Sequence, residues 1–146
     1  FQDVRDHYTR LLFGCDPIAL RRTDPERYAV VARLTSAEVM RRSFAEWRRD
    51  DSTCAGAMVW TLGDLWGGPC WGIIDATGRP KAPWFALHRV LQPRWIWLHE
   101  EGLNGVTLSI GNETREEYRG SLELALYRDG QHVIYCSPRS RRCSTF

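Results

Sequence analysis

The sequence has almost no lysine, and its charges show no strong bias. Lys81 is the only lysine among 20 basic residues, and the rest are arginines that alternate with 18 acidic residues. The net charge is only +2. A protein that binds nucleic acid usually gathers its basic residues on one face. The balanced pattern therefore argues against a nucleic-acid partner.

Long apolar runs and metal-ligand motifs are also missing. No run approaches the roughly 20 residues of a membrane span, so no membrane partner is expected. The five cysteines are odd in number, no pair has zinc-ligand spacing, and the four histidines are scattered. We therefore expect no metal and no cofactor. Cys15 and Cys54 lie in apolar settings typical of small buried thiols, which favours a reducing compartment, the cytoplasm.

The most informative stretch is residues 54–75. Residues 56–62 are almost wholly apolar and predict a short strand that is buried on both faces. The Gly-rich loop that follows carries Asp64, Trp66 and Trp71. Aromatic faces pack on the C–H face of a sugar ring, and carboxylates accept hydrogen bonds from its hydroxyls. This pattern indicates a sugar site.

Helical patterns surround this stretch, and strand patterns follow it. Helices are predicted over residues 1–13, 17–22, 25–49 and 80–91, with capping residues before the second and third. From residue 94 apolar residues alternate, and Asp129-Gly130 predicts a hairpin turn. Two helices have marked apolar faces: Val4, Tyr8, Leu11 and Leu12 in the first, and Val30, Leu34, Ala37, Met40, Phe44 and Trp47 in the third.

Both halves of the chain have too few elements to form a complete domain. The first half has one buried strand without neighbouring strands, and a parallel strand needs partners on both edges. The second half has about four strands, fewer than the roughly seven of a complete sandwich. We therefore expect a piece of a larger protein, with residues 1–93 from an α/β domain and residues 94–146 from a β domain.

Three motifs resemble glycoside hydrolase family 2, and within it the β-mannosidases. They are Gly-Ala-Met-Val-Trp-Thr-Leu-Gly-Asp-Leu-Trp at 56–66, Trp-Gly-Ile-Ile-Asp at 71–75 and Gly-Arg-Pro-Lys-Ala-Pro-Trp at 78–84. Glu-Gly-Leu-Asn-Gly at 101–105 is similar to the start of the family's next domain. The resemblance implies that residues 1–93 are the C-terminal part of a (β/α)8 TIM barrel, with residues 56–62 as its eighth strand. Residues 94–146 would begin an immunoglobulin-like β-sandwich.

The resemblance also implies a function and site residues. The expected enzyme is a retaining hydrolase that removes terminal β-linked mannose. Trp60 matches the family tryptophan that walls the sugar site, and Asp64 and Trp66 match its Asp and Trp, whereas Gly63 replaces the usual Asn. The two catalytic carboxylic acids lie on earlier strands in this family, so we assign no catalytic residue here, and the fragment alone is expected to be inactive.

Other interpretations of the same residues remain open. Trp60 could be plain barrel core, Trp66 could pack within the loop, and Asp64 could organise the site or cap the loop. Trp71 and Asp75 are expected to be structural, and Asn112 begins a glycosylation sequon. A non-catalytic carbohydrate-binding module would use the same tryptophans, and an arginine-rich nucleic-acid binder is a third possibility.

Overall fold

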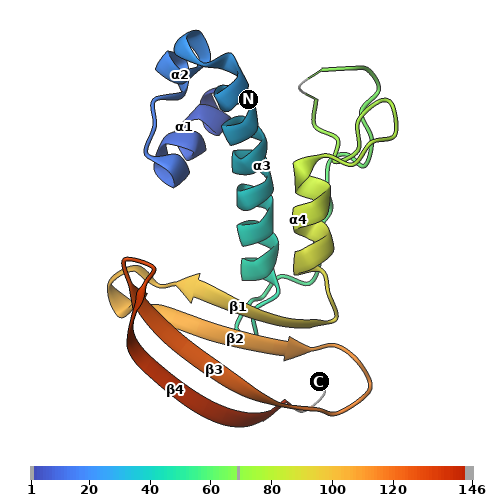
Figure 1. Ribbon diagram of the computed structural model, residues 1–146. Helices are drawn as coiled ribbons and strands as arrows, with labels where there is room; N and C mark the ends of the chain where they lie inside the picture. Colours follow the sequence, from blue (N-terminus) through green and yellow to red (C-terminus); the bar gives the residue numbers. More distant parts are fainter. Residues whose placement is uncertain (1, 69, 144–146) are drawn as a thin grey trace. The chain divides into compact units, whose positions relative to one another are not determined.

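The computed structural model describes residues 2–68 and 70–143, and describes residues 132–143 by their backbone alone (Figure 1). The chain divides into two compact units between Gln92 and Pro93. The first unit is helical and the second consists of antiparallel strands, so the described residues form a mixed α/β chain. The larger domains to which the two units would belong stay a prediction.

Four helices build the first unit: α1 (Gln2–Phe13), α2 (Pro17–Thr23), α3 (Pro25–Trp47) and α4 (Ala82–Val90). The predicted caps are confirmed. Asp16 accepts a hydrogen bond from the Ile18 amide at 3.0 Å, and Asp24 accepts one from the Arg27 amide at 3.0 Å. In each helix a proline follows the cap, where its missing N–H has no helical partner to lose. None of the helices in the described ranges is long and apolar enough to cross a membrane.

The seam between α3 and α4 is mainly apolar. The two helices lie side by side (Figure 1), and Phe44, Ala45, Leu87 and Val90 are buried. At the end of α3 the Arg48 guanidinium donates hydrogen bonds to the backbone oxygens of Val90 and Gln92. These oxygens lie at the C-terminal end of α4, where a positive charge is favourable. Arg48 therefore joins the ends of the two helices.

The seam between α1 and α3 has polar contacts instead. Thr9 and Thr35 are fully buried, and their hydroxyl oxygens lie 2.9 Å apart. The Thr35 hydroxyl donates to the Val31 carbonyl, so Thr9 is the donor in the pair. The Tyr28 hydroxyl donates to buried Asp6 at 3.3 Å. Hydrogen bonds thus hold α1 to α3 where the sequence pattern predicted apolar packing.

The apolar face of α1 and the N-terminal half of the apolar face of α3 are largely exposed. Leu11 is 70% exposed, Val4 is also exposed, and Val30 and Leu34 are each about half exposed. The apolar face that Val4 and Leu11 share is therefore not packed within this unit. The physical reason is that α1 presents its Asp6 and Thr9 side to α3, so its apolar side has no cover among the described residues.

The predicted strand over residues 56–62 does not form within this unit. Residues 54–59 form neither helix nor strand, and Met58 is 95% exposed. A strand exists only when neighbouring strands satisfy its backbone hydrogen bonds, and none lies beside these residues in the described unit. We call residues 54–62 the open segment.

The second unit consists of two hairpins. β1 (Arg94–Glu100) pairs with β2 (Val106–Asn112) in antiparallel register, from Arg94 opposite Asn112 to Glu100 opposite Val106. The short 3-10 helix η1 (Gly102–Asn104) joins them. β3 (Tyr118–Arg128) pairs with β4 (His132–Cys143). The Asp129-Gly130 turn is confirmed, because both residues have positive φ, 53° and 68°, as a tight hairpin turn requires.

Candidate functional site

The loop before α4 is closed on itself by backbone hydrogen bonds. Gly63 bridges to Ile74, and Ile74 bridges in turn to Pro80. The Asp64 amide donates to the Ile74 carbonyl at 2.9 Å, and the Lys81 amide donates to the Ile73 carbonyl at 2.8 Å. We call residues 63–81 the closed loop, because its beginning, middle and end are hydrogen-bonded together.

An ion pair lies at the centre of the closed loop. The Asp64 side chain is 1% exposed, and its Oδ2 lies 2.8 Å from Lys81 Nζ. The other carboxylate oxygen, Oδ1, accepts a hydrogen bond from the Gly72 amide at 2.6 Å. Lys81 Nζ also donates to the Cys70 carbonyl at 3.0 Å. Both carboxylate oxygens of Asp64 are therefore engaged within the loop itself.

A second carboxylate shapes the return to α4. Asp75 Oδ1 accepts hydrogen bonds from the amides of Arg79 and Thr77 at 2.9 and 2.8 Å, and from the Thr77 hydroxyl at 2.7 Å. The bond from the Arg79 amide, followed by those from Thr77, lowers the pKa of Asp75 below its usual 3.8. The predicted structural role of Asp75 is confirmed.

Large aromatic side chains extend from the open segment and the closed loop into solvent. Trp60 is 81% exposed, and Trp66 and Trp71 are 65% and 58% exposed. The peptide between Trp60 and Thr61 is cis. Leu62 and Leu65 are exposed in the same stretch. Exposed apolar area of this kind is typical of binding surfaces or of surfaces that another part of a protein covers.

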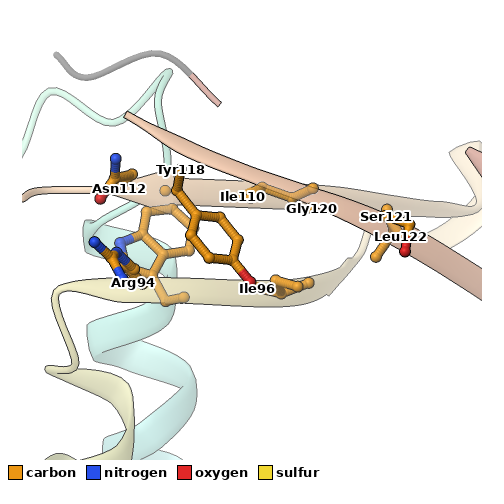
Figure 2. A pocket seen from close by; sticks show the side chains of 10 residues that line it. Arg94, Ile96, Ile110, Asn112, Tyr118, Gly120, Ser121 and Leu122 are labelled. Atoms are coloured by element: carbon orange, nitrogen blue, oxygen red, sulfur yellow. The ribbon is translucent and has the colours of Figure 1, made fainter. Parts of the chain in front are cut away.

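The second unit has an open groove of about 550 Å³ along β1, β2 and β3 (Figure 2). The Arg94 guanidinium lies 5.1 Å from the centre of the Tyr118 ring, as the close-up shows. The Trp95 indole donates to Glu113 Oε1 at 3.4 Å. Ile96, Ile110 and Leu122 supply much of the lining, which is typical of a sheet face more than of a polar binding site.

Several sequence-based interpretations concern other side chains. Cys54 is exposed, so the prediction that it is a buried thiol is wrong, because the open segment gives it no cover. Among the described side chains, no group of three or more His, Cys, Asp or Glu could hold a metal ion. Cys136 and Cys143 lie outside the described side chains. The cytoplasmic compartment expected from the cysteines stays a prediction.

The glycosylation sequon at Asn112 is part of a turn. Asn112 is 2% exposed, and its side-chain amide donates to the Glu116 carbonyl at 2.7 Å. Its side-chain oxygen accepts a bond from the Thr114 hydroxyl at 2.6 Å. In this fold the acceptor nitrogen is already bonded and buried, so the sequon serves as a turn.

Sequence reasoning singled out Asp64 but missed the two residues that hold its carboxylate. The structure brings Asp64, Gly72 and Lys81 together, whereas it leaves Trp60 and Trp66 in solvent. One signal could have identified Lys81: it is the only lysine in a chain whose other basic residues are all arginine.

Comparison with known proteins gives a partial match. No family model matches the chain. "Beta-mannosidase B" of Emericella nidulans is 38% identical over 82 residues, which are 54% of this chain and 10% of that protein. The proteins of the same name from Aspergillus niger and Aspergillus fumigatus are 37% and 35% identical over the same length. The chain thus matches about a tenth of the length of these relatives. The similarity supports a relationship to the β-mannosidases of glycoside hydrolase family 2 over about half of the chain.

Proposed function

We propose that this chain is a segment of a retaining glycoside hydrolase that removes terminal β-linked mannose from oligosaccharides. The observation that carries the proposal is the exposure of Trp60 and Trp66 on a stretch whose ends are held by hydrogen bonds. An exposed indole is costly in water unless a ligand covers it, and the C–H face of a pyranose suits its face. The similarity to proteins named β-mannosidase supports mannose as the sugar.

In this proposal Trp60 and Trp66 contact the sugar, whereas Asp64 organises the site. Asp64 has both oxygens engaged within the closed loop, so its contribution is to fix the loop. A retaining glycosidase also needs two carboxylic acids about 5–5.5 Å apart. We propose that the rest of a longer enzyme supplies both, and that this chain alone does not hydrolyse mannosides.

The proposal extends to the fold of the longer enzyme. Residues 1–93 would be the C-terminal part of a (β/α)8 barrel, and the open segment would become its eighth strand when neighbouring strands flank it. This placement accounts for the exposed apolar residues of α1 and α3 and, apart from Trp60, of the open segment, which the barrel would cover. Residues 94–146 would begin an immunoglobulin-like β-sandwich, for which the groove along β1, β2 and β3 would be interior.

The decisive test compares two tryptophans in the full-length enzyme. Trp60→Ala should greatly lower kcat/KM on an aryl β-mannoside while the melting temperature changes little. The control is Trp47→Ala at the end of α3, where the indole packs on Phe44 with ring centres 5.2 Å apart. It should lower the melting temperature and leave kcat/KM nearly unchanged. Normal kinetics with a large loss of stability in Trp60→Ala would show that Trp60 is core.

A non-catalytic carbohydrate-binding module is the alternative, and the coding sequence upstream distinguishes the two. A preceding apolar segment that ends in a glutamate, at the position expected for a barrel strand, supports the hydrolase. If no such carboxylate is encoded and the protein binds mannosides without hydrolysing them, the binding module is the correct function.

A further inference from the structure

The ion pair between Asp64 and Lys81 and the hydrogen bond from the Gly72 amide hold the closed loop together. We call these three groups the fastening. The Asp64 side chain is 1% exposed, and each of its oxygens accepts a hydrogen bond from within the closed loop. A sugar hydroxyl could reach this carboxylate only if the loop opened. The carboxylate therefore acts on its neighbours in the chain, and its effect on a ligand is indirect.

Gly72 fits closely against this carboxylate. A Cβ atom at Gly72 would lie 2.5 Å from Asp64 Oδ1 and 2.6 Å from the Asp64 amide nitrogen, far closer than atoms can approach. Because Gly72 has no side chain, its amide reaches the carboxylate at 2.6 Å. The contact joins the two ends of the segment that carries Trp66 and Trp71.

Lys81 supplies the second contact, from the residue immediately before α4. Its ammonium group reaches both Asp64 Oδ2 and the Cys70 carbonyl, at 2.8 and 3.0 Å. An ammonium is a compact charge with three donors on one atom, whereas a guanidinium presents its donors in a planar fork. Two acceptors that converge on one donor atom favour an ammonium, which accounts for a lysine at this position in a chain whose other basic residues are all arginine.

We propose that Asp64 and Lys81 are positioning residues: together with the Gly72 amide they hold the closed loop shut and so set where Trp66 lies for sugar binding. The inference rests on the proposed function for the identity of the ligand, but the fastening itself is a property of the loop. Removing Lys81 leaves the buried Asp64 carboxylate without its counter-charge, which costs more than removing both partners.

The first experiment needs no sugar. Two quantities are measured in the 146-residue chain. They are the rate of hydrogen exchange at the Gly72 amide and the NMR positions of the indole N–H resonances of Trp66 and Trp71. Lys81→Met should speed exchange at Gly72 by roughly tenfold or more, because the loop opens locally, and should shift both indole resonances. The matched control is Arg79→Met, which removes an exposed basic side chain of the same loop and should change neither. Unchanged exchange and resonances in Lys81→Met would refute the fastening.

Two further variants test whether Asp64 and Lys81 act together and whether the lysine geometry matters. The double variant of Asp64→Asn with Lys81→Met should open the loop less than the two single effects combined, because no unpaired charge remains. Simple additivity would contradict the pairing. Lys81→Arg keeps the charge but changes the donor geometry, and we expect intermediate exchange at Gly72. Exchange equal to the wild type would refute the role of the bond to the Cys70 carbonyl.

The kinetic experiment uses the full-length enzyme. Lys81→Met should raise KM for an aryl β-mannoside by about tenfold or more and change kcat less, since misplaced binding residues weaken substrate positioning. A normal KM with a loosened loop would refute the positioning role. If the wild-type enzyme has a protected Gly72 amide but neither binds nor hydrolyses mannosides, the proposed function fails while the fastening stands.

Discussion

The open segment and the closed loop are neighbours in sequence and differ in what holds them. Residues 54–62 are the more apolar stretch, yet they form no strand, and Met58 and Trp60 are among the most exposed side chains described. Residues 63–81 are richer in glycine and charge, yet they are fixed by Asp64, Gly72 and Lys81. The loop is held by its own residues, whereas the apolar segment is hydrogen-bonded to the loop at its end, through the Thr61 and Leu62 carbonyls.

The helices show the same contrast. Thr9 and Thr35 join α1 to α3 through contacts contained in this unit, and both are fully buried. The apolar sides of α1 and α3, which include Leu11 and Leu34, are exposed. Polar contacts thus hold α1 to α3 within this unit, while much of the apolar surface of the two helices stays uncovered among the described residues.

The largest expected effect comes from adding one methyl group to the closed loop. In Gly72→Ala the new Cβ would overlap Asp64, so we expect a loss of roughly 1–3 kcal/mol in the free energy of unfolding. The measurement is urea unfolding followed by circular dichroism and by exchange at the Asp64 amide. The control is Gly56→Ala, where a Cβ would meet no atom within 4 Å and little change is expected. Equal effects at the two glycines would remove the distinction between loop and segment.

A comparable loss, unequal between the two partners, is expected at the seam between α1 and α3. Thr35→Val leaves the buried Thr9 hydroxyl without its acceptor, and we expect a loss of about 1–3 kcal/mol. Thr9→Val leaves Thr35 bonded to the Val31 carbonyl and should cost less. Urea midpoints of the two variants provide the comparison. A larger cost for Thr9→Val would mean that the direction of this hydrogen bond is reversed.

Substitutions on the exposed apolar faces of α1 and α3 should alter self-association more than the free energy of unfolding. Leu11→Gln combined with Leu34→Gln places polar groups on exposed apolar faces, so unfolding should change by less than about 0.5 kcal/mol. We expect the isolated chain to bind a hydrophobic dye and to self-associate, and the double variant should do both less. A wild-type chain that is monomeric and binds no dye would contradict the interpretation of these faces as uncovered.

The smallest effect concerns pH and a pair on the surface of α3. Hydrogen bonds from Arg41, then from Arg42, lower the pKa of Glu38 from its usual 4.5 to about 2. Because the pKa is lower in the folded state, the ionised carboxylate stabilises the fold above about pH 4.5, and this contribution is lost as the pH falls towards 2. Exposed pairs contribute about 0.2–1 kcal/mol each. Urea midpoints at pH 7 and pH 3 should differ less in Glu38→Gln than in the wild type.

Sequence reasoning succeeded where the cause of structure is local. Asp16 and Asp24 begin helices because a cap acts on amides two or three residues away, and Asp129-Gly130 makes a turn for a similar reason. The open segment forms no strand here because apolar character alone does not provide the neighbouring strands that a strand needs. The pairing of Asp64 with Lys81 was missed because 17 residues separate them and the chain has many other charges.

The hydrogen bonds of Arg48 affect how the stretch between α3 and α4 can change in length. Its hydrogen bonds to the Val90 and Gln92 carbonyls pin together the two ends of the stretch that contains the open segment and the closed loop. The entropic free-energy cost of closing a flexible stretch grows slowly, by about 0.6 kcal/mol for each doubling of its length. Insertions and deletions in the open segment should therefore be tolerated while the helix pair keeps its geometry, whereas the closed loop, fixed by Asp64, Gly72 and Lys81, should tolerate few. A change in the length of the open segment would alter how far Trp60 extends, while Arg48 keeps the C-terminal ends of α3 and α4 together.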